Sequence, residues 1–125
     1  MPERIVVSFR GVANVEEDGG QSYLDRAIAI KQQCELRGAT LCAWSAQTLC
    51  VDLPTDDIEA AVELAIDAVK TGSGIDSGFR AGIAQGSMNP VVEAAAPEVL
   101  SWGPPLLHAV SLARIARPGE VLIDP

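Results

Sequence analysis

Few side chains in this sequence have the type and spacing that catalysis requires. His108 is the only histidine, so a nucleophilic mechanism would have to use it as the general base. No serine, cysteine or aspartate stands in a pattern that matches it, and a lone helical histidine is usually structural or exposed. We therefore treat His108 as a candidate ligand or interface residue, and we expect no catalytic residue there.

Two polar segments have the composition of ligand-binding loops. The run Glu16-Glu17-Asp18 contains potential cation ligands, and the segment 72–78 is rich in glycine and serine. Carboxylates between glycines usually form a solvated loop. The glycine-rich segment lacks the G-x-G-x-x-G pattern, and it follows a helix and precedes a strand, the reverse of the order that aims a helix N-terminus at phosphate. We expect a solvated loop and a flexible turn, with no metal ion and no cofactor.

The three cysteines, Cys34, Cys42 and Cys50, are odd in number and lack the C-x-x-C spacing of zinc and redox sites. We expect reduced thiols that fill the core. If the segment 45–47 is a three-residue hairpin loop, Cys42 and Cys50 lie directly opposite each other on paired strands. A direct cross-strand disulfide is geometrically awkward, so two packed thiols are the expected arrangement.

Composition and charge narrow the class of protein. The 125 residues are 48% apolar, which is enough for one domain, but no apolar run approaches the roughly 20 residues of a membrane span. The opening Met1-Pro2-Glu3-Arg4 is not a basic signal-peptide region. Seventeen acidic and nine basic residues give a net charge of −8, which repels nucleic acid and anionic lipid. We expect a cytoplasmic protein with neither nucleic acid nor membrane as a partner.

Hydrophobic patterning predicts the elements of an α/β (α+β) fold. The predicted elements are a strand at 5–9, a helix at 23–37, strands at 40–44 and 48–53, a helix between Thr55 and Gly72, and a strand at 79–85. Their order is βαββαβ, the ferredoxin-like arrangement. An irregular link over 86–101, a third helix over 105–116 and a last strand over 120–123 follow it.

Local signals mark the helix ends and faces. Ser22 and Asp25 resemble a capping box, Gly38 ends the first helix, and Thr55 is the expected N-cap of the second. The second helix has an apolar stripe predicted to face the core: Ile58, Ala61, Val62, Ala65, Ile66 and Val69. The third has the apolar face Leu106, Ala109, Val110 and Ala113.

Four pieces of the chain carry a family resemblance. They are the opening strand with Gly11 after it, the hairpin Leu41–Leu53, the run 80–86 (Arg-Ala-Gly-Ile-Ala-Gln-Gly, similar to R-x-G-I-x-x-G), and Trp102–Ile123 with its Pro-Gly-Glu-Val-Leu ending. Together they resemble the class III adenylate/guanylate cyclase domain over most of the chain. The resemblance implies a ferredoxin-like core with an added C-terminal helix and strand. It also implies a single domain over 1–125, which we expect to be a module of a longer signalling protein.

The resemblance breaks at the positions that bind metal in this family. Its working enzymes hold two metal ions with two aspartates, one at the end of the opening strand and one in the hairpin turn. Here the end of the strand carries Phe9 and Arg10, and the turn carries Gln47. An arginine cannot ligate a cation, and a glutamine offers only a neutral oxygen.

It also breaks at the nucleotide positions. The Asn and Arg of the family's third helix, which orient the ribose and stabilise the transition state, correspond to Leu107 and Ser111. The purine-selecting lysine corresponds to Ala43, and the second purine contact falls near Glu98. Arg80, Trp102 and His108 remain as candidate ligand or interface residues, and Trp102 and Trp44 are each candidates for either an interface or the core.

These substitutions lead to a functional expectation. We expect a catalytically inactive, cyclase-like domain that acts as a regulatory or protein-interaction module and self-associates or binds a protein partner. One alternative is a non-catalytic sensor of purine nucleotides or another small ligand, which needs Arg10, Gln47 or Arg80 to face a cleft. The other is a weak or atypical nucleotide cyclase.

Overall fold

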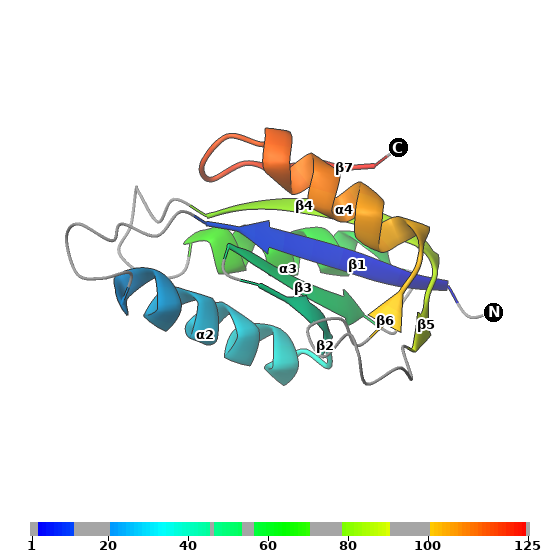
Figure 1. Ribbon diagram of the computed structural model, residues 1–125, viewed down its shortest axis with the longest axis horizontal. Helices are drawn as coiled ribbons and strands as arrows, with labels where there is room; N and C mark the ends of the chain where they lie inside the picture. The colour runs from blue at the N-terminus through cyan, green and yellow to red at the C-terminus, as the bar shows by residue number, and fades with distance from the viewer. Residues whose placement is uncertain are drawn as a thin grey trace.

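The computed structural model describes residues 3–11, 21–45, 47–53, 57–70, 79–90 and 101–124. The elements in this part of the chain are β1 (Glu3–Arg10), α2 (Gln21–Leu36), β2 (Thr40–Trp44), β3 (Thr48–Leu53), α3 (Ile58–Lys70), β4 (Arg80–Ser87), β5 (Asn89–Pro90), β6 (Ser101–Trp102), α4 (Pro104–Ile115) and β7 (Val121–Ile123) (Figure 1). The predicted strands and helices are confirmed, with ends that differ by about one to three residues.

The five-stranded sheet has the order β2-β3-β1-β4-β7. Strand β1 pairs antiparallel with β3 and with β4, whereas β7 pairs parallel with β4. The first four strands are the ferredoxin-like core, and α4 with β7 is the added C-terminal unit. The predicted α/β fold is therefore confirmed.

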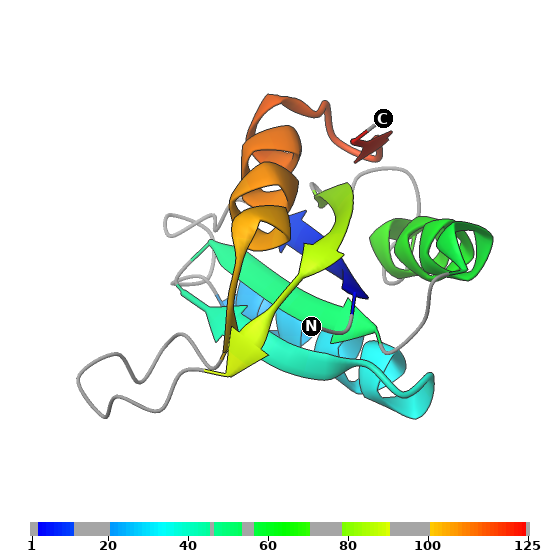
Figure 2. The ribbon, with the colours of Figure 1, turned by 90° about the vertical axis from the view of Figure 1, so that its right-hand side faces the viewer.

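Helices cover both faces of the sheet, and each face has its own apolar core. Figure 2 shows α2 and α3 on one side of the sheet and α4 on the other. Alternate residues of β1 divide between the two sides, because successive side chains of a strand point to opposite faces. Ile5, Val7 and Phe9 join the larger core with α2 and α3, whereas Val6 joins the smaller core with α4.

Helix α3 begins at a carboxylate cap. The Oδ1 atom of Asp57 accepts hydrogen bonds from the backbone N–H groups of Glu59 at 3.1 Å and Ala60 at 3.3 Å. These are the N2 and N3 amides that an N-cap satisfies. Asp57 is thus the N-cap, and the predicted cap Thr55 lies outside the described residues.

The buried face of α3 differs from the predicted stripe. The buried residues are Ala61, Leu64, Ala65, Ala68 and Val69. Ile58 and Val62 are partly buried, and Ile66 is 36% exposed, so the prediction that Ile66 packs in the core is wrong. The helix is rotated so that its Leu64 and Ala68 side meets the sheet, which leaves one edge of the predicted stripe near solvent.

Helix α2 starts earlier than the sequence pattern predicts. It begins at Gln21, so Ser22 lies inside the helix and the predicted capping box is wrong. Asp25 instead accepts a hydrogen bond from Nε2 of Gln21 at 2.8 Å, a side-chain pair between neighbouring turns. The predicted stop is confirmed, because Gly38 has a φ of 85° that favours glycine.

The hairpin of β2 and β3 has the predicted strands with a different register. Ala43, and not Cys42, lies opposite Cys50, because the pairing shifts between Leu41 and Ala43. Such a shift is typical of a β-bulge, in which an extra residue of one strand interrupts the pairing. The predicted opposition of Cys42 and Cys50 is therefore wrong, and all three cysteines are buried thiols outside any disulfide bond.

The connection between β4 and α4 is more regular than predicted. Strand β4 continues to Ser87, and Asn89–Pro90 pairs antiparallel with Ser101–Trp102 in a small second sheet. The prediction of an irregular link over 86–101 is therefore wrong at both ends. Pro90 does not prevent the pairing, because a proline is tolerated in an edge strand. Residues 91–100, including Glu98, lie outside the described part.

No helix within the described residues is both long enough and apolar enough to cross a membrane.

Candidate functional site

The ends of three strands meet at one corner of the sheet. Arg10, the last residue of β1, lies opposite Thr48 of β3 and Arg80 of β4. Nη2 of Arg10 donates a hydrogen bond to Oε1 of Gln47 at 3.2 Å, and the backbone N–H of Gly11 donates to the carbonyl oxygen of Gln47 at 3.2 Å. The structure thus brings together Arg10 and Gln47, the two residues assigned from the sequence to metal positions.

Phe9 and Arg10, both candidates for the first of those positions, lie on opposite faces of the sheet. Phe9 is fully buried in the core that β1 forms with α2 and α3. Arg10 points to the other face, which α4 covers in part. Of the two residues, only Arg10 lies on the face of the sheet that α4 covers and can approach Gln47. Phe9 is a core residue.

The side chains at this corner do not fit a divalent cation. The guanidinium of Arg10 is a cationic donor without an acceptor atom, and it already occupies the side-chain oxygen of Gln47. Within the described residues, no group of three or more His, Cys, Asp or Glu side chains could hold a metal ion. The Glu16-Glu17-Asp18 run and the segment 72–78 lie outside the described residues.

Arg10 and Arg80 form an unusual pair. Directly opposed residues of antiparallel strands have Cβ atoms about 4.5–5.5 Å apart on the same face, where like charges repel. Nη1 of Arg80 donates to the carbonyl oxygen of Ala116 at 3.1 Å, and its Nε is buried without a hydrogen-bond partner in the described part. Burial raises the pKa of the Tyr23 hydroxyl above its usual value, and the nearby positive charge of Arg10 offsets part of this rise. Neither arginine has a carboxylate partner among the described residues.

The outward face of α4 carries two exposed apolar side chains, and one of them, Leu107, stands where the family resemblance implies a polar residue. Leu107, Ser111 and Ile115 follow at intervals of four and share one helix face. Leu107 is 51% exposed and Ile115 is 73% exposed, and Ser111 between them is exposed too. The opposite side of α4, with Leu106, Ala109 and Ala113, is buried against the sheet as predicted.

His108 lies apart from the corner of Arg10 and Gln47. Its Nδ1 is 3.2 Å from Oδ2 of Asp124, which follows β7, and both side chains are partly exposed. A carboxylate is therefore within its reach, but within the described residues His108 has no hydrogen bond to a serine or cysteine nucleophile. The pair links α4 to the end of the chain's last strand.

The other candidate positions have mainly packing roles. Ala43 is partly buried against the core beneath α4, and Trp44 packs against the larger core. The backbone of Trp102 pairs with Asn89 in the small second sheet. Trp44 thus contacts the core but is only partly buried, and the candidate interface roles of Trp44 and Trp102 stay predictions.

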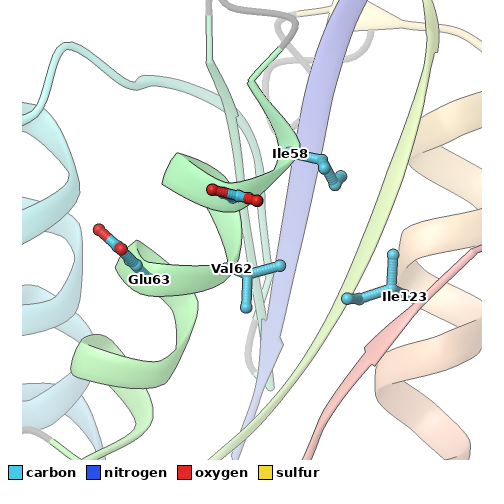
Figure 3. A pocket seen from close by; sticks show the side chains of 5 residues that line it. Ile58, Val62, Glu63 and Ile123 are labelled. Atoms are coloured by element: carbon cyan, nitrogen blue, oxygen red, sulfur yellow. The ribbon is translucent and has the colours of Figure 1, made fainter.

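The structure also shows a hollow that sequence reasoning missed. It lies between α3 and β7 and is lined by Ile58, Glu59, Val62, Glu63 and Ile123 (Figure 3). The periodicity of α3 indicated a core stripe, and no local signal shows that Ile123 lies beside it. Helix α3, which supplies four of the five lining residues, lies on the opposite side of the sheet from α4 (Figure 2).

Cys34 and Cys50 are packing residues whose thiol pKa is raised. Burial raises the pKa of Cys34 from its usual value near 9 to about 12, and neighbouring Arg37 partly offsets the effect. Burial likewise raises the pKa of Cys50 to about 11, although its hydrogen bond with Oγ of Ser8, 3.4 Å from Sγ, favours the thiolate. Neither thiol is thus an activated nucleophile.

We predict that stability falls in base and that Cys34 contributes to the fall. Because its pKa is raised on folding, the unfolded chain releases the thiol proton above about pH 9 while the folded chain retains it to about pH 12. The stabilisation is complete below the unfolded pKa and is lost as the pH rises through this window, at about 1.4 kcal/mol per pH unit. Urea unfolding of wild type and Cys34→Ala between about pH 9 and 11 measures this, and parallel slopes would contradict it.

Comparison with known proteins concerns the fold. No protein-family model matches the sequence, and a search of curated proteins gives no match. Among solved structures, a non-canonical dimeric guanylyl cyclase domain of the RhoGC fusion protein from Blastocladiella emersonii has a TM-score of 0.70 at 16% identity, covering 97% of this chain and 79% of that one. The adenylyl cyclase CyaB from P. aeruginosa gives 0.70 at 16%, covering 97% and 76%.

Adenylate cyclases of Trypanosoma brucei in their monomeric state give a TM-score of 0.76 at 10% identity, covering 98% of this chain and 73% of theirs. The match spans nearly the whole chain in each case. The chain therefore has the fold of class III adenylyl and guanylyl cyclase catalytic domains.

Proposed function

We propose that this chain is a non-catalytic module of the cyclase fold, which acts as a regulatory or protein-interaction domain of a cytoplasmic signalling protein. In this proposal two copies associate through the outward face of α4. The observation that supports this association is the pair of exposed apolar side chains on that face, Leu107 and Ile115, with Ser111 between them. A solvent-facing helix normally presents polar side chains there.

The charge of α4 favours a second copy as the partner. The protein has a net charge of −8, so most of its surface repels another copy. Helix α4, however, contains no acidic residue, and its ionisable side chains are His108 and Arg114. Two copies can therefore meet at this face without opposing carboxylates. The dimeric guanylyl cyclase domain among the similar structures supports association by this fold.

The absence of catalysis is proposed from the chemistry of the replaced residues. Arg10 and Gln47 offer no carboxylate for a cation, and Leu107 and Ser111 offer no cation for a phosphate. Loss of a single charge-stabilising group costs about a hundredfold or more in rate. A second copy of the same chain would bring the same replacements, so association with itself would not restore them.

Sedimentation equilibrium tests the proposed association. We expect a wild-type dimer that Leu107→Glu weakens by about a hundredfold or more, because the symmetric contact loses an apolar side chain and gains two facing charges. Leu36→Glu is the matched control: Leu36 is 88% exposed on α2, on the other side of the sheet, and its replacement should leave the dimer unchanged. A wild-type protein that stays monomeric near its solubility limit would refute this role of α4.

The arginine pair favours a second candidate function, a sensor of an anionic ligand such as a purine nucleotide. Two opposed arginines, one with a buried and unpartnered Nε, are an arrangement that an anion would stabilise. Because Arg10 is cationic, such binding would need no divalent metal.

Calorimetric titration with ATP and GTP tests this candidate. We expect binding that persists in EDTA, weakens at high salt and falls by about tenfold or more in Arg10→Gln. Arg114→Gln, at an exposed position of α4, is the control for the loss of one positive charge. No heat with either nucleotide would exclude the sensor, and cyclic nucleotide formation in the presence of Mg²⁺ or Mn²⁺ would instead establish an atypical cyclase.

A further inference from the structure

An apolar groove lies at the edge of the described sheet, between α3 and β7. Figure 3 shows Ile58, Val62 and Ile123 pointing toward one another across it. The hollow has a volume of about 470 Å³. Ile58 and Val62 also contact the main core from their inner side, so the groove has a fixed floor.

The row of apolar side chains on α3 continues past the hollow. Ile66 follows Ile58 and Val62 at the same spacing of four residues and is 36% exposed. Eight residues of α-helix span about 12 Å, which is the length of about four residues of an extended strand. A strand bound in the groove would therefore place two of its side chains, both on the same face of that strand, against α3 and Ile123.

The backbone of β7 offers hydrogen bonds to such a strand. The carbonyl oxygen of Glu120 accepts from the N–H of Ala81 at 3.0 Å, and the N–H of Asp124 donates to Ile83 at 2.8 Å. Because bonding direction alternates along a strand, the N–H and C=O groups of Val121 and Ile123 point away from β4. Strand β7 is the last strand of the sheet, and no described strand pairs with its outer edge.

The charge beside the groove indicates the chemistry of the occupant. Glu59 and Glu63 line the α3 side of the hollow, and both are exposed without an ion-pair partner in the described part of the chain. A second copy added at the same edge would bring a second set of these carboxylates alongside, which is unfavourable. A segment with lysine or arginine side chains would complement them.

We propose that β7 and the α3 groove bind an extended, basic segment of a partner protein. The segment adds to β7 as an edge strand, a known mode of peptide recognition. It places two apolar side chains against Ile58, Val62 and Ile123, and basic side chains near Glu59 and Glu63. This surface is separate from the outward face of α4, and the proposal does not depend on self-association.

Binding of a designed probe tests this. The probe is an acetylated nine-residue peptide of alternating valine and lysine, and its control has glutamate in place of lysine. We expect the lysine peptide to bind at least about tenfold more tightly. Hydrogen exchange with the full chain should show new protection of the Val121 and Ile123 amides, with no change in β2 at the opposite edge of the sheet.

Two sets of variants separate the groove from general charge effects. The double change Glu59→Lys with Glu63→Lys should weaken the lysine peptide by about tenfold or more. Asp25→Lys with Glu35→Lys changes the net charge equally on α2, where only exposed contacts are lost, and should weaken it less than about twofold. Ile123→Asp should abolish binding, while Leu36→Asp should not.

Three results would overturn the proposal. One is equal weakening by the two double variants, which would indicate attraction by net charge alone. Another is protection at β2 instead of β7. The third is a dimer that Ile123→Asp dissociates, with no binding of the peptide, because the edge would then pair with a second copy.

Discussion

Replacing Gly82 by alanine should destabilise the fold by about 3 kcal/mol or more, because α4 lies directly on this residue. A Cβ atom at Gly82 would overlap the carbonyl oxygen of Ala109 and lie 2.7 Å from the backbone nitrogen of Ala113. Both are backbone atoms of a helix, so neither can turn aside as a side chain can. The helix would have to move off the sheet and expose the smaller core. Urea unfolding of the two proteins measures the difference.

Gly86 provides the matched control on the same strand and the same face. There a Cβ would lie 3.1 Å from Cδ and 3.2 Å from Cγ of Pro105, atoms of a ring that can shift by a few tenths of an ångström. Gly86→Ala should therefore cost about 1 kcal/mol or less. Similar losses in the two variants would show that α4 does not lie as close to Gly82 as described. Because Leu107 is on α4, Gly82→Ala should also weaken the proposed dimer.

This packing explains why the run from Arg80 to Gly86 contains glycine at two positions. In the run Arg80-Ala-Gly-Ile-Ala-Gln-Gly86, the glycines are the points where α4 and its first turn approach β4, and Arg80 reaches the carbonyl oxygen of Ala116 just after the helix. The motif thus docks the added helix on the sheet. The sequence pattern indicates a family resemblance, and the contacts with α4 give its physical basis.

Regular elements were predictable because their signals are local. The β-branched run of β1, the periodicity of α4 and the glycine that ends α2 each act within a few residues. The failures within the five-stranded sheet and in α3 depend on register or rotation. A bulge moves Cys42 out of line with Cys50, a rotation of α3 leaves Ile66 near solvent, and the opposition of Arg10 and Arg80 follows from strand pairing alone.

The candidate site was predictable in part for the same reason. The sequence places Arg10 and Gln47 at the ends of adjacent strands, and the structure joins them by a hydrogen bond. It could not decide between Phe9 and Arg10, because a shift of one residue in register exchanges the two faces of a strand. The groove between α3 and β7 depends on the parallel pairing of β7 with β4, which joins residues 40 positions apart in the sequence.

Because the side chain of Phe9 is buried in the core and that of Arg10 is partly exposed, substitutions at these neighbouring residues of β1 should differ greatly in their effect on stability. Phe9→Asp should prevent folding, because it removes a fully buried aromatic side chain and places a carboxylate without partners in the core. The first loss alone is worth about 3–5 kcal/mol, and the buried charge adds several more. Phe9→Ala, which omits the charge, should remain measurable in urea and show the first loss only.

Arg10→Asp is the control, since it introduces the same carboxylate one residue further along. It removes an exposed hydrogen bond to Gln47 and relieves the repulsion with Arg80, so stability should change by about 1 kcal/mol or less. If Phe9→Asp were tolerated and Arg10→Asp were not, β1 would present its faces in the opposite sense. The corner of Arg10, Gln47 and Arg80 would then belong to the core, and an anion could not reach it.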